Sequence, residues 1–193
     1  MNDSSTGGYL GPAVATPPLE DAELDAVFQQ LIVGVTGLPG PMVRPRWQTT
    51  VPKQPEPSVN WCALGVTVLP PDAGPAITHN PTGDGTDVYV RHQTINVLAS
   101  FYGPNCGQNS QMLLDGLAIP QNLEQLKAND MQSVTEGDRR AAPDFLNQQW
   151  IRRYDVTLVF SRKITRTYAV RNLNSAGASV QTQNGTTPVN VTQ

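Results

Sequence analysis

The stretch DVYVRHQTINVLASFY, residues 87–102, carries the longest strand pattern in the chain. Apolar residues recur at every second position along its second half, at Ile95, Val97, Ala99 and Phe101. The positions between them include the polar or amphipathic Thr94, Asn96, Ser100 and Tyr102. Successive side chains of a strand point to opposite faces of the sheet. The stretch therefore predicts a long strand with one face buried, and that face needs a second layer to cover it.

A helix ahead of this strand is the clearest helix that the sequence predicts. Its apolar residues follow the i, i+3, i+4 spacing of an amphipathic helix, namely Leu24, Val27, Phe28, Leu31, Ile32 and Val35. Thr16 is a possible cap, and Pro17 and Pro18 suit the helix entry. Four acids in the first turns complement the helix dipole. Gly37 and the Pro39–Pro41 segment stop the helix.

Two more helices are expected after residue 102, where Gly103 and Pro104 break the strand. Asn105 can cap the first of them, which carries Met112, Leu113 and Leu117. Residues 121–128 form the second and shorter helix, with Leu123 and Leu126 buried.

The remaining apolar patterns predict shorter strands separated by polar loops. Residues 61–69 alternate, with Cys62, Leu64, Val66 and Val68 on one face, and residues 46–49 suit a short edge strand. Residues 131–135 predict a strand followed by a polar loop to Pro143, and residues 72–85 predict a long exposed loop. Near the end, Trp150, Arg152, Tyr154, Val156, Leu158 and Phe160 share one face, and a bend at residues 161–163 leads into a partner strand at residues 164–170.

This order of elements predicts an α+β fold, with a largely antiparallel sheet flanked by helices. The 193 residues, 38% of them hydrophobic, suit one globular domain. We expect a flexible, extended N-terminal arm over residues 1–17, a single domain over residues 18–172 and a polar C-terminal tail over residues 173–193. The tail has too few apolar side chains to form a core, so we expect it to be disordered or ordered by a partner.

The charges are sparse but unevenly distributed. Only 15% of residues are charged and the net charge is −3, so no basic field favours nucleic acid. Glu20, Asp21, Glu23 and Asp25 form an acidic cluster, whereas only basic residues follow Asp155, namely Arg162, Lys163, Arg166 and Arg171. Such a subunit can meet its own copies head to tail, and such contacts close into rings. A solvated basic strand is the simpler alternative.

Two features of the sequence bear on its location in the cell. No stretch approaches the roughly 18 apolar residues of a membrane span. The first residues lack the basic start and the apolar run of a signal peptide. We therefore expect the protein to be made and kept in a cytoplasm, where two cysteines stay reduced.

Residues for catalysis are few, and no motif connects them. A cysteine nucleophile needs a histidine within reach, but nothing ties Cys106 to His79 or His92. Neither these residues nor Cys62 have the spacing of a zinc site. Asp155, flanked by two arginines, suits an ion pair on a strand surface better than a general acid. We assign no catalytic, cofactor-binding or metal-binding residue, and no cofactor.

Two other functions are suggested by individual residues. A small enzyme using Cys106 is one, because the cysteine lies near a helix start that lowers a thiol pKa. A single-stranded nucleic-acid binder stacking bases on Tyr154, Phe160 and Tyr168 is the other. Those aromatic residues alternate with core-forming aliphatic residues, which favours a place in the core.

Several segments in fixed order resemble the phage neck terminator family of tailed bacteriophages. They are Trp61–Gly65, Arg91–Val97, Ser100–Asn105, Leu114–Leu117, Gln121–Asn122, Trp150–Val156 and Arg166–Tyr168, within a similar region that covers roughly residues 45–171. The N-terminal arm and the tail beyond Asn172 have no clear counterpart.

The resemblance implies a structural virion protein that acts by assembly and not by catalysis. Members of such families look like a sheet flanked by helices, arranged as a six-membered ring around the DNA channel. They cap the tail tube or sheath and join it to the head connector, with the genome passing through without specific binding. The resemblance thus implies a homo-oligomer with tail and connector proteins as partners. Another neck ring protein, such as a head-completion stopper or a collar protein, is the closest alternative.

Overall fold

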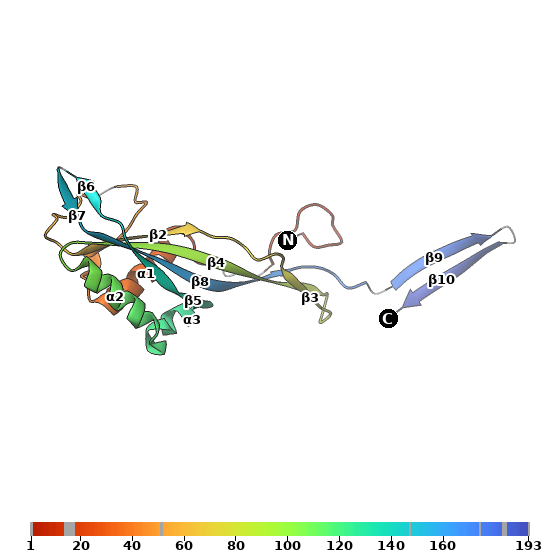
Figure 1. Cartoon of the computed structure of the whole chain (residues 1–193). Helices are drawn as coiled ribbons and strands as arrows, with labels where there is room; N and C mark the ends of the chain where they lie inside the picture. Colours follow the sequence, from red (N-terminus) through yellow and green to blue (C-terminus); the bar gives the residue numbers. More distant parts are fainter. Residues whose placement is uncertain are drawn as a thin grey trace. The chain divides into compact units, whose positions relative to one another are not determined.

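A computed structural model describes residues 2–13, 18–50, 52–146, 148–173, 175–182 and 185–192 (Figure 1). The elements in chain order are α1 (Asp21–Thr36), η1 (Gly40–Met42), β1 (Val43–Pro45), β2 (Trp61–Val68), β3 (Ala76–Asn80), β4 (Thr86–Tyr102), α2 (Cys106–Leu117), η2 (Pro120–Leu123), α3 (Glu124–Lys127), β5 (Met131–Ala141), β6 (Asp144–Leu146), β7 (Gln149–Ile151), β8 (Arg153–Tyr168), β9 (Ser175–Thr182) and β10 (Gly185–Thr192). The chain divides into two compact units, residues 1–16, 76–90 and 165–193, and residues 17–75 and 91–164. The division falls within β4 and within β8.

The main sheet has the strand order β1-β2-β4-β8-β5, with β3 paired to β4. The pairs β2–β4, β3–β4 and β5–β8 are antiparallel, whereas β1 runs parallel to β2. Helices α1, α2 and α3 lie on one side of this sheet (Figure 1). The predicted α+β class, with a mostly antiparallel sheet, is confirmed.

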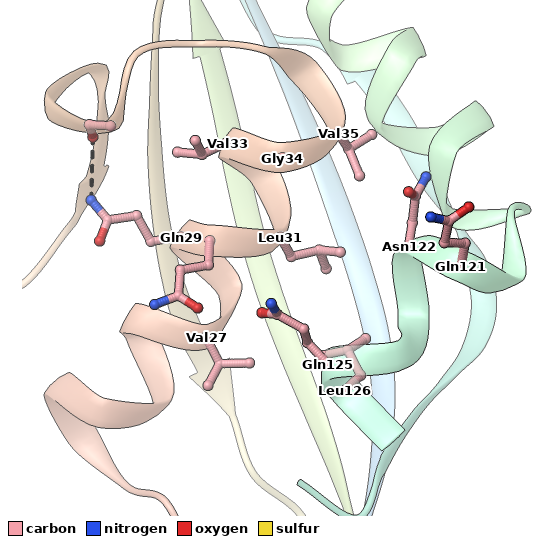
Figure 2. Close-up of a pocket in the computed structure, with 12 residues that line it drawn as sticks. Val27, Gln29, Leu31, Val33, Gly34, Val35, Gln121, Asn122, Gln125 and Leu126 are labelled. Carbon is pink, nitrogen blue, oxygen red and sulfur yellow. Dashed lines mark hydrogen bonds between the residues drawn. The ribbon is translucent and has the colours of Figure 1, made fainter. Parts of the chain in front are cut away.

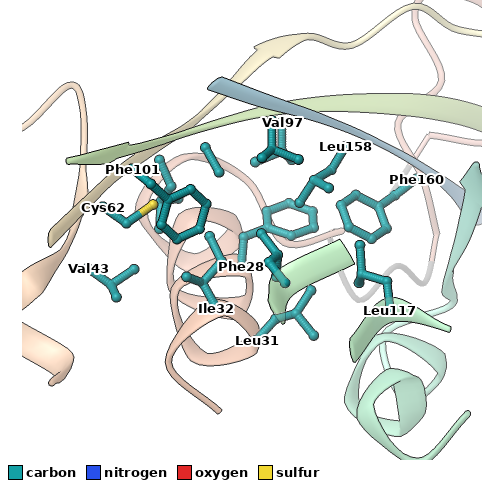
Figure 3. Close-up of a cluster of buried hydrophobic side chains, with 14 of the residues drawn as sticks. Phe28, Leu31, Ile32, Val43, Cys62, Val97, Phe101, Leu117, Leu158 and Phe160 are labelled. Carbon is teal, nitrogen blue, oxygen red and sulfur yellow. The ribbon is translucent and has the colours of Figure 1, made fainter. Parts of the chain in front are cut away.

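The core of the unit formed by residues 17–75 and 91–164 lies between the sheet and its helices. As the alternation predicts, Ile95, Val97, Ala99 and Phe101 of β4 are buried. From β8, Phe160 stacks on Phe28 of α1 with ring centroids 4.9 Å apart (Figure 3). Each such buried side chain contributes about 1.5–3 kcal/mol relative to an exposed one. The layer of helices is therefore held mainly by apolar burial.

Helix α1 has the predicted apolar stripe but a different start. Leu24, Phe28, Leu31 and Ile32 are buried, and Val27 and Val35 pack at the edge of the core. Its N-cap residue is Glu20, without a side-chain cap, so the proposed Thr16 cap is wrong; Thr16 itself lies outside the described residues. At the other end, Gly37 has a left-handed φ of 70° and its N–H donates to the Val33 carbonyl, as a C-terminal glycine does.

The helices after β4 agree with the sequence at their buried positions. Helix α2 follows the N-cap residue Asn105, although the side chain of Asn105 makes no cap bond. Leu113 and Leu117 are buried, whereas Met112 is 38% exposed. The predicted helix at residues 121–128 consists of η2 and α3, where Leu126 is buried as expected and Leu123 is only partly buried.

Two predictions at the β1–β2 edge are wrong. The edge strand is β1 and not residues 46–49, although the Arg46 N–H still donates to the Leu64 carbonyl at 2.7 Å. A register shift in β2 between Val66 and Val68 leaves Val68 53% exposed. An inserted residue reverses the alternation of faces, so the pattern that placed Val68 in the core fails there.

Three loops or bends predicted from polar residues are strands instead. Strand β5 continues to Ala141 through two register shifts, where a loop was expected. Strand β8 runs from Arg153 to Tyr168 without the expected bend, and it pairs with β5. Residues 76–80 of the expected long loop form β3, which is exposed along its whole length. In each case the backbone N–H and C=O groups form hydrogen bonds to a neighbouring strand. A sequence pattern of polar side chains does not indicate this pairing.

The other unit contains β3, parts of β4 and β8, and both ends of the chain. His79 of β3 lies between Asp87 and Asn172, at 2.7 Å from its Nδ1 and 2.8 Å from its Nε2. In the N-terminal arm, the Ser4 N–H donates to the Ala169 carbonyl, and Arg171 pairs with Asp3 at 2.8 Å. Strands β9 and β10 form an antiparallel hairpin in the tail that was expected to be disordered or partner-dependent.

Candidate assembly surfaces

A polar network lies on the sheet face opposite the buried face of β4. Arg46 donates to the hydroxyl of Ser100, which donates to Asp155. Arg153 pairs with Asp155 at 3.1 Å and donates to both carboxylate oxygens of Asp144 at 2.8 Å. The predicted Asp155 ion pair is confirmed. The sequence did not point to Arg46, whose partner Ser100 lies 54 residues away, or to Asp144, which meets Arg153 across the β6–β7 hairpin.

Strands β6 and β7 form a short hairpin that carries two exposed aromatic side chains; we name it the aromatic hairpin. Phe145 is 59% exposed and Trp150 is 70% exposed, with ring centroids 5.0 Å apart. The ion pair between Arg153 and Asp144 fixes the base of the hairpin. The placement of Trp150 on the core face was wrong, because Arg152 lies outside both β7 and β8 and interrupts the alternation.

The surroundings of the aromatic hairpin are basic. Residues 138–155 contain four arginines and three aspartates, a net charge of +1, and Arg153 is paired with Asp144 and Asp155. Arg140 and Arg152 are exposed, whereas Arg139 packs over the Tyr154 ring with its guanidinium 5.1 Å from the ring centroid. Exposed arginine beside exposed tryptophan is the composition that protein–protein interfaces favour.

A cleft of about 630 Å³ lies where α1 begins, and we name it the acidic cleft. Its lining combines carboxylates with apolar side chains and a tryptophan: Glu20, Asp21, Ala22, Leu24, Asp25, Pro45, Trp47, Gln48, Thr49, Thr50, Val66 and Leu69. Trp47 is 65% exposed. Burial raises the pKa of the Asp25 carboxyl, against a hydrogen bond from the Val66 backbone that lowers it, and the nearby Asp21 charge raises it further. No lysine or arginine lines the cleft in the described part of the chain.

A second groove, of about 520 Å³, separates α1 from η2 and α3 (Figure 2). Its polar side chains are all amides, namely Gln29, Gln30, Gln121, Asn122 and Gln125. Gln29 already donates to the carbonyls of Gly40 at 3.3 Å and Val43 at 2.6 Å. This amide groove carries no charged lining residue among those described, so it offers no electrostatic selectivity.

One of the basic residues expected to meet acidic neighbours is used within the chain. Arg162 is 3% exposed and donates to Gln93 at 2.8 Å, to the Leu19 carbonyl at 2.6 Å and to Glu20 at 2.5 Å. Its partners within the chain leave it unavailable for a neighbouring subunit, which corrects that part of the sequence-based hypothesis. Lys163, in contrast, is exposed.

The residues considered for catalysis are not gathered into one site. Cys106 is 1% exposed and Cys62 is fully buried, and both are free thiols. The two ring nitrogens of His79 contact Asp87 and Asn172, so its imidazole is not paired with a cysteine thiol. Across the described residues, no group of three or more histidine, cysteine or acidic side chains is arranged to hold a metal ion.

The described surfaces thus include an exposed aromatic hairpin, an acidic cleft and an amide groove. The chain matches the phage neck terminator protein family over residues 22–186. It belongs to that family, and it is a structural protein of the phage neck that acts among other tail and head proteins. The match extends beyond the segments at residues 45–171, so α1 and the first part of the tail also have family counterparts.

No curated protein matches the chain. Within the described part of the chain, none of the helices has the length and hydropathy of a membrane-spanning segment.

Proposed function

We propose that the protein terminates the phage tail and joins it to the head connector as a closed ring, six-membered by family resemblance, around the DNA channel. The family match over residues 22–186 carries this proposal. The mechanism is geometric, because one face of the ring contacts the last tail ring and the other face contacts the connector. Assembly takes place in the host cytoplasm.

The surfaces of the subunit support an assembly role. It presents an exposed aromatic hairpin flanked by arginines and a separate cleft lined by carboxylates. A heterologous contact joins two different surfaces of this kind. The net charge of −3 suits a channel through which DNA passes without specific binding. We also propose that residues 18–172 act as the assembling domain, with the arm at 1–17 and the tail at 173–193 docking on neighbours.

Native mass spectrometry of the purified protein, with and without tail tubes, tests the ring. We expect a closed oligomer, either alone or when tubes are added. Labelled antibody on virions should bind between the head and the tail. A strict monomer that binds neither tubes nor connectors would overturn the proposal, and a label elsewhere along the virion axis would favour a stopper or collar protein.

The enzyme alternative is tested by Cys106→Ser. A thiol that is 1% exposed has little access to a substrate. We therefore expect the variant to assemble and to infect at the wild-type level. Normal assembly with lost infectivity would instead indicate cysteine-dependent chemistry.

A further inference from the structure

We propose that the aromatic hairpin of one subunit docks into the acidic cleft of a second copy of this chain, and that this contact repeats around the ring. The inference rests on the proposed ring and names the two surfaces that build it. It concerns the unit formed by residues 17–75 and 91–164, which contains both surfaces.

The hairpin has the properties of a docking element and not of a flexible loop. Phe145 and Trp150 expose most of their area to water, yet they contact one another and stand on a base held by the ion pair between Arg153 and Asp144. A preorganised element loses little conformational entropy when it binds. A few residues supply most of the binding energy at protein interfaces, and tryptophan and arginine are enriched among them.

The cleft complements the hairpin in both charge and chemistry. Asp21 and Asp25 line the cleft beside Glu20, which pairs with Arg162, and the exposed Arg140 and Arg152 flank the hairpin. Trp47 and the edges of Val66 and Leu69 give the cleft an apolar wall for an aromatic ring. A volume of about 630 Å³ lies in the range of roughly 300–1,000 Å³ that takes a ligand-sized group. The amide groove offers the hairpin no opposite charge.

The hairpin and the acidic end of the cleft lie apart within one subunit, whereas the Trp47 end of the cleft is near the hairpin base, because Trp47 and Asp144 line one pocket. Strand β8 begins at Arg153, beside the hairpin, and Arg162 of the same strand pairs with Glu20 at the cleft. Nine residues of strand at about 3.3 Å each separate these points by roughly 30 Å. A contact between the hairpin and the acidic end of the cleft therefore joins two copies through different surfaces, which makes it heterologous and able to close a ring.

Cysteine cross-linking tests the contact directly. The double variant Ala22→Cys with Gln149→Cys places one thiol in the cleft and one on the hairpin, both at exposed positions. Mild oxidation should yield a ladder of covalent multimers on a denaturing gel. The native Cys62 and Cys106 are buried and should not contribute. The matched control, Gln125→Cys with Gln149→Cys, probes the amide groove and should remain monomeric.

Charge reversal provides a second, independent test. Arg140→Glu with Arg152→Glu should raise the concentration at which rings dissociate by about tenfold or more. Asp21→Lys with Asp25→Asn should do the same, and a chain carrying all four changes should recover part of the loss. Trp150→Ala should weaken rings comparably, whereas Ile119→Ala, also at an exposed apolar residue, should not. Circular dichroism confirms that each variant is folded.

The outcomes separate this inference from the proposed ring. Rings that form normally in the charge-reversed variants, or that cross-link through the amide groove, would refute the hairpin–cleft contact and leave the ring function intact. A wild-type protein that stays monomeric even with tail tubes would overturn the ring and this contact together.

Discussion

Replacing Arg162 by Met should destabilise the protein by about 2 kcal/mol. The side chain of Arg162 is 4% exposed, and its guanidinium makes three hydrogen bonds, to Gln93, Leu19 and Glu20. Such bonds contribute a net of about 0.5–1.5 kcal/mol each, so losing three costs about 2–4 kcal/mol. Burying a methionine in place of a charge offsets part of this loss. Glu20 is 47% exposed and regains water, so it adds little further cost.

Urea unfolding followed by tryptophan fluorescence measures this change. With a slope of about 2 kcal/mol per M, the midpoint should fall by about 1 M. The matched control is Lys163→Met, because its neighbouring position in β8 is exposed and its change should stay within about 0.5 kcal/mol. Glu20→Gln should destabilise the wild-type protein slightly and the Arg162→Met variant not at all.

The reasoning fails if Arg162→Met and Lys163→Met have equal midpoints. It also fails if Arg162→Met unfolds normally but disrupts oligomers. Arg162 would then act between subunits, as the charge pattern first indicated, and the bonds to Leu19 and Glu20 would not describe the folded chain.

Two further predictions concern the other unit and the contact between helices. Both ring nitrogens of His79 face acceptors, Asp87 first and then Asn172, and these hydrogen bonds raise its pKa above the ordinary value near 6.5. The stabilisation by protonated His79 is therefore complete below about pH 6.5 and is lost as pH rises through the raised pKa. The unfolding midpoints of wild type and His79→Gln should differ at low pH and converge at high pH. Midpoints that differ equally at every pH would contradict this. Gly116→Ala places a methyl group against Val35 of α1, so it should cost about 1–3 kcal/mol despite the better helix propensity of alanine. Unfolding of the double variant with Val35→Ala should show a less than additive loss, and full additivity would refute the steric cause.

The sequence predicted the elements that bury an apolar face. In β4 apolar residues recur at every second position, and in α1 they recur at the i, i+3, i+4 spacing over several turns. Each regular spacing identifies the element and its buried side chains. The resemblance in ordered segments, from Trp61 to Tyr168, likewise predicted the family that the match confirms. These signals are local, or depend only on order along the chain.

The surfaces could not be predicted in the same way. Phe145 and Trp150 are exposed, although large aromatic residues are usually expected in the core. The residue type alone does not show whether such a side chain faces the core or water. Strand β3 has no buried face, so it has no period to detect. The partners of Arg162 lie 69 to 143 residues away in the chain, beyond any local pattern.

What the sequence by itself determined is the α+β class, the two longest apolar elements and membership in a family of phage neck proteins. The tertiary structure alone decided which charges are used inside the subunit and which face outward. Glu20 and Arg162 meet within the chain, whereas Arg140 and Arg152 stay exposed beside the aromatic hairpin. The physical reason is that burial and pairing depend on distances in space, which strand pairing and bulges set and which residue order does not record.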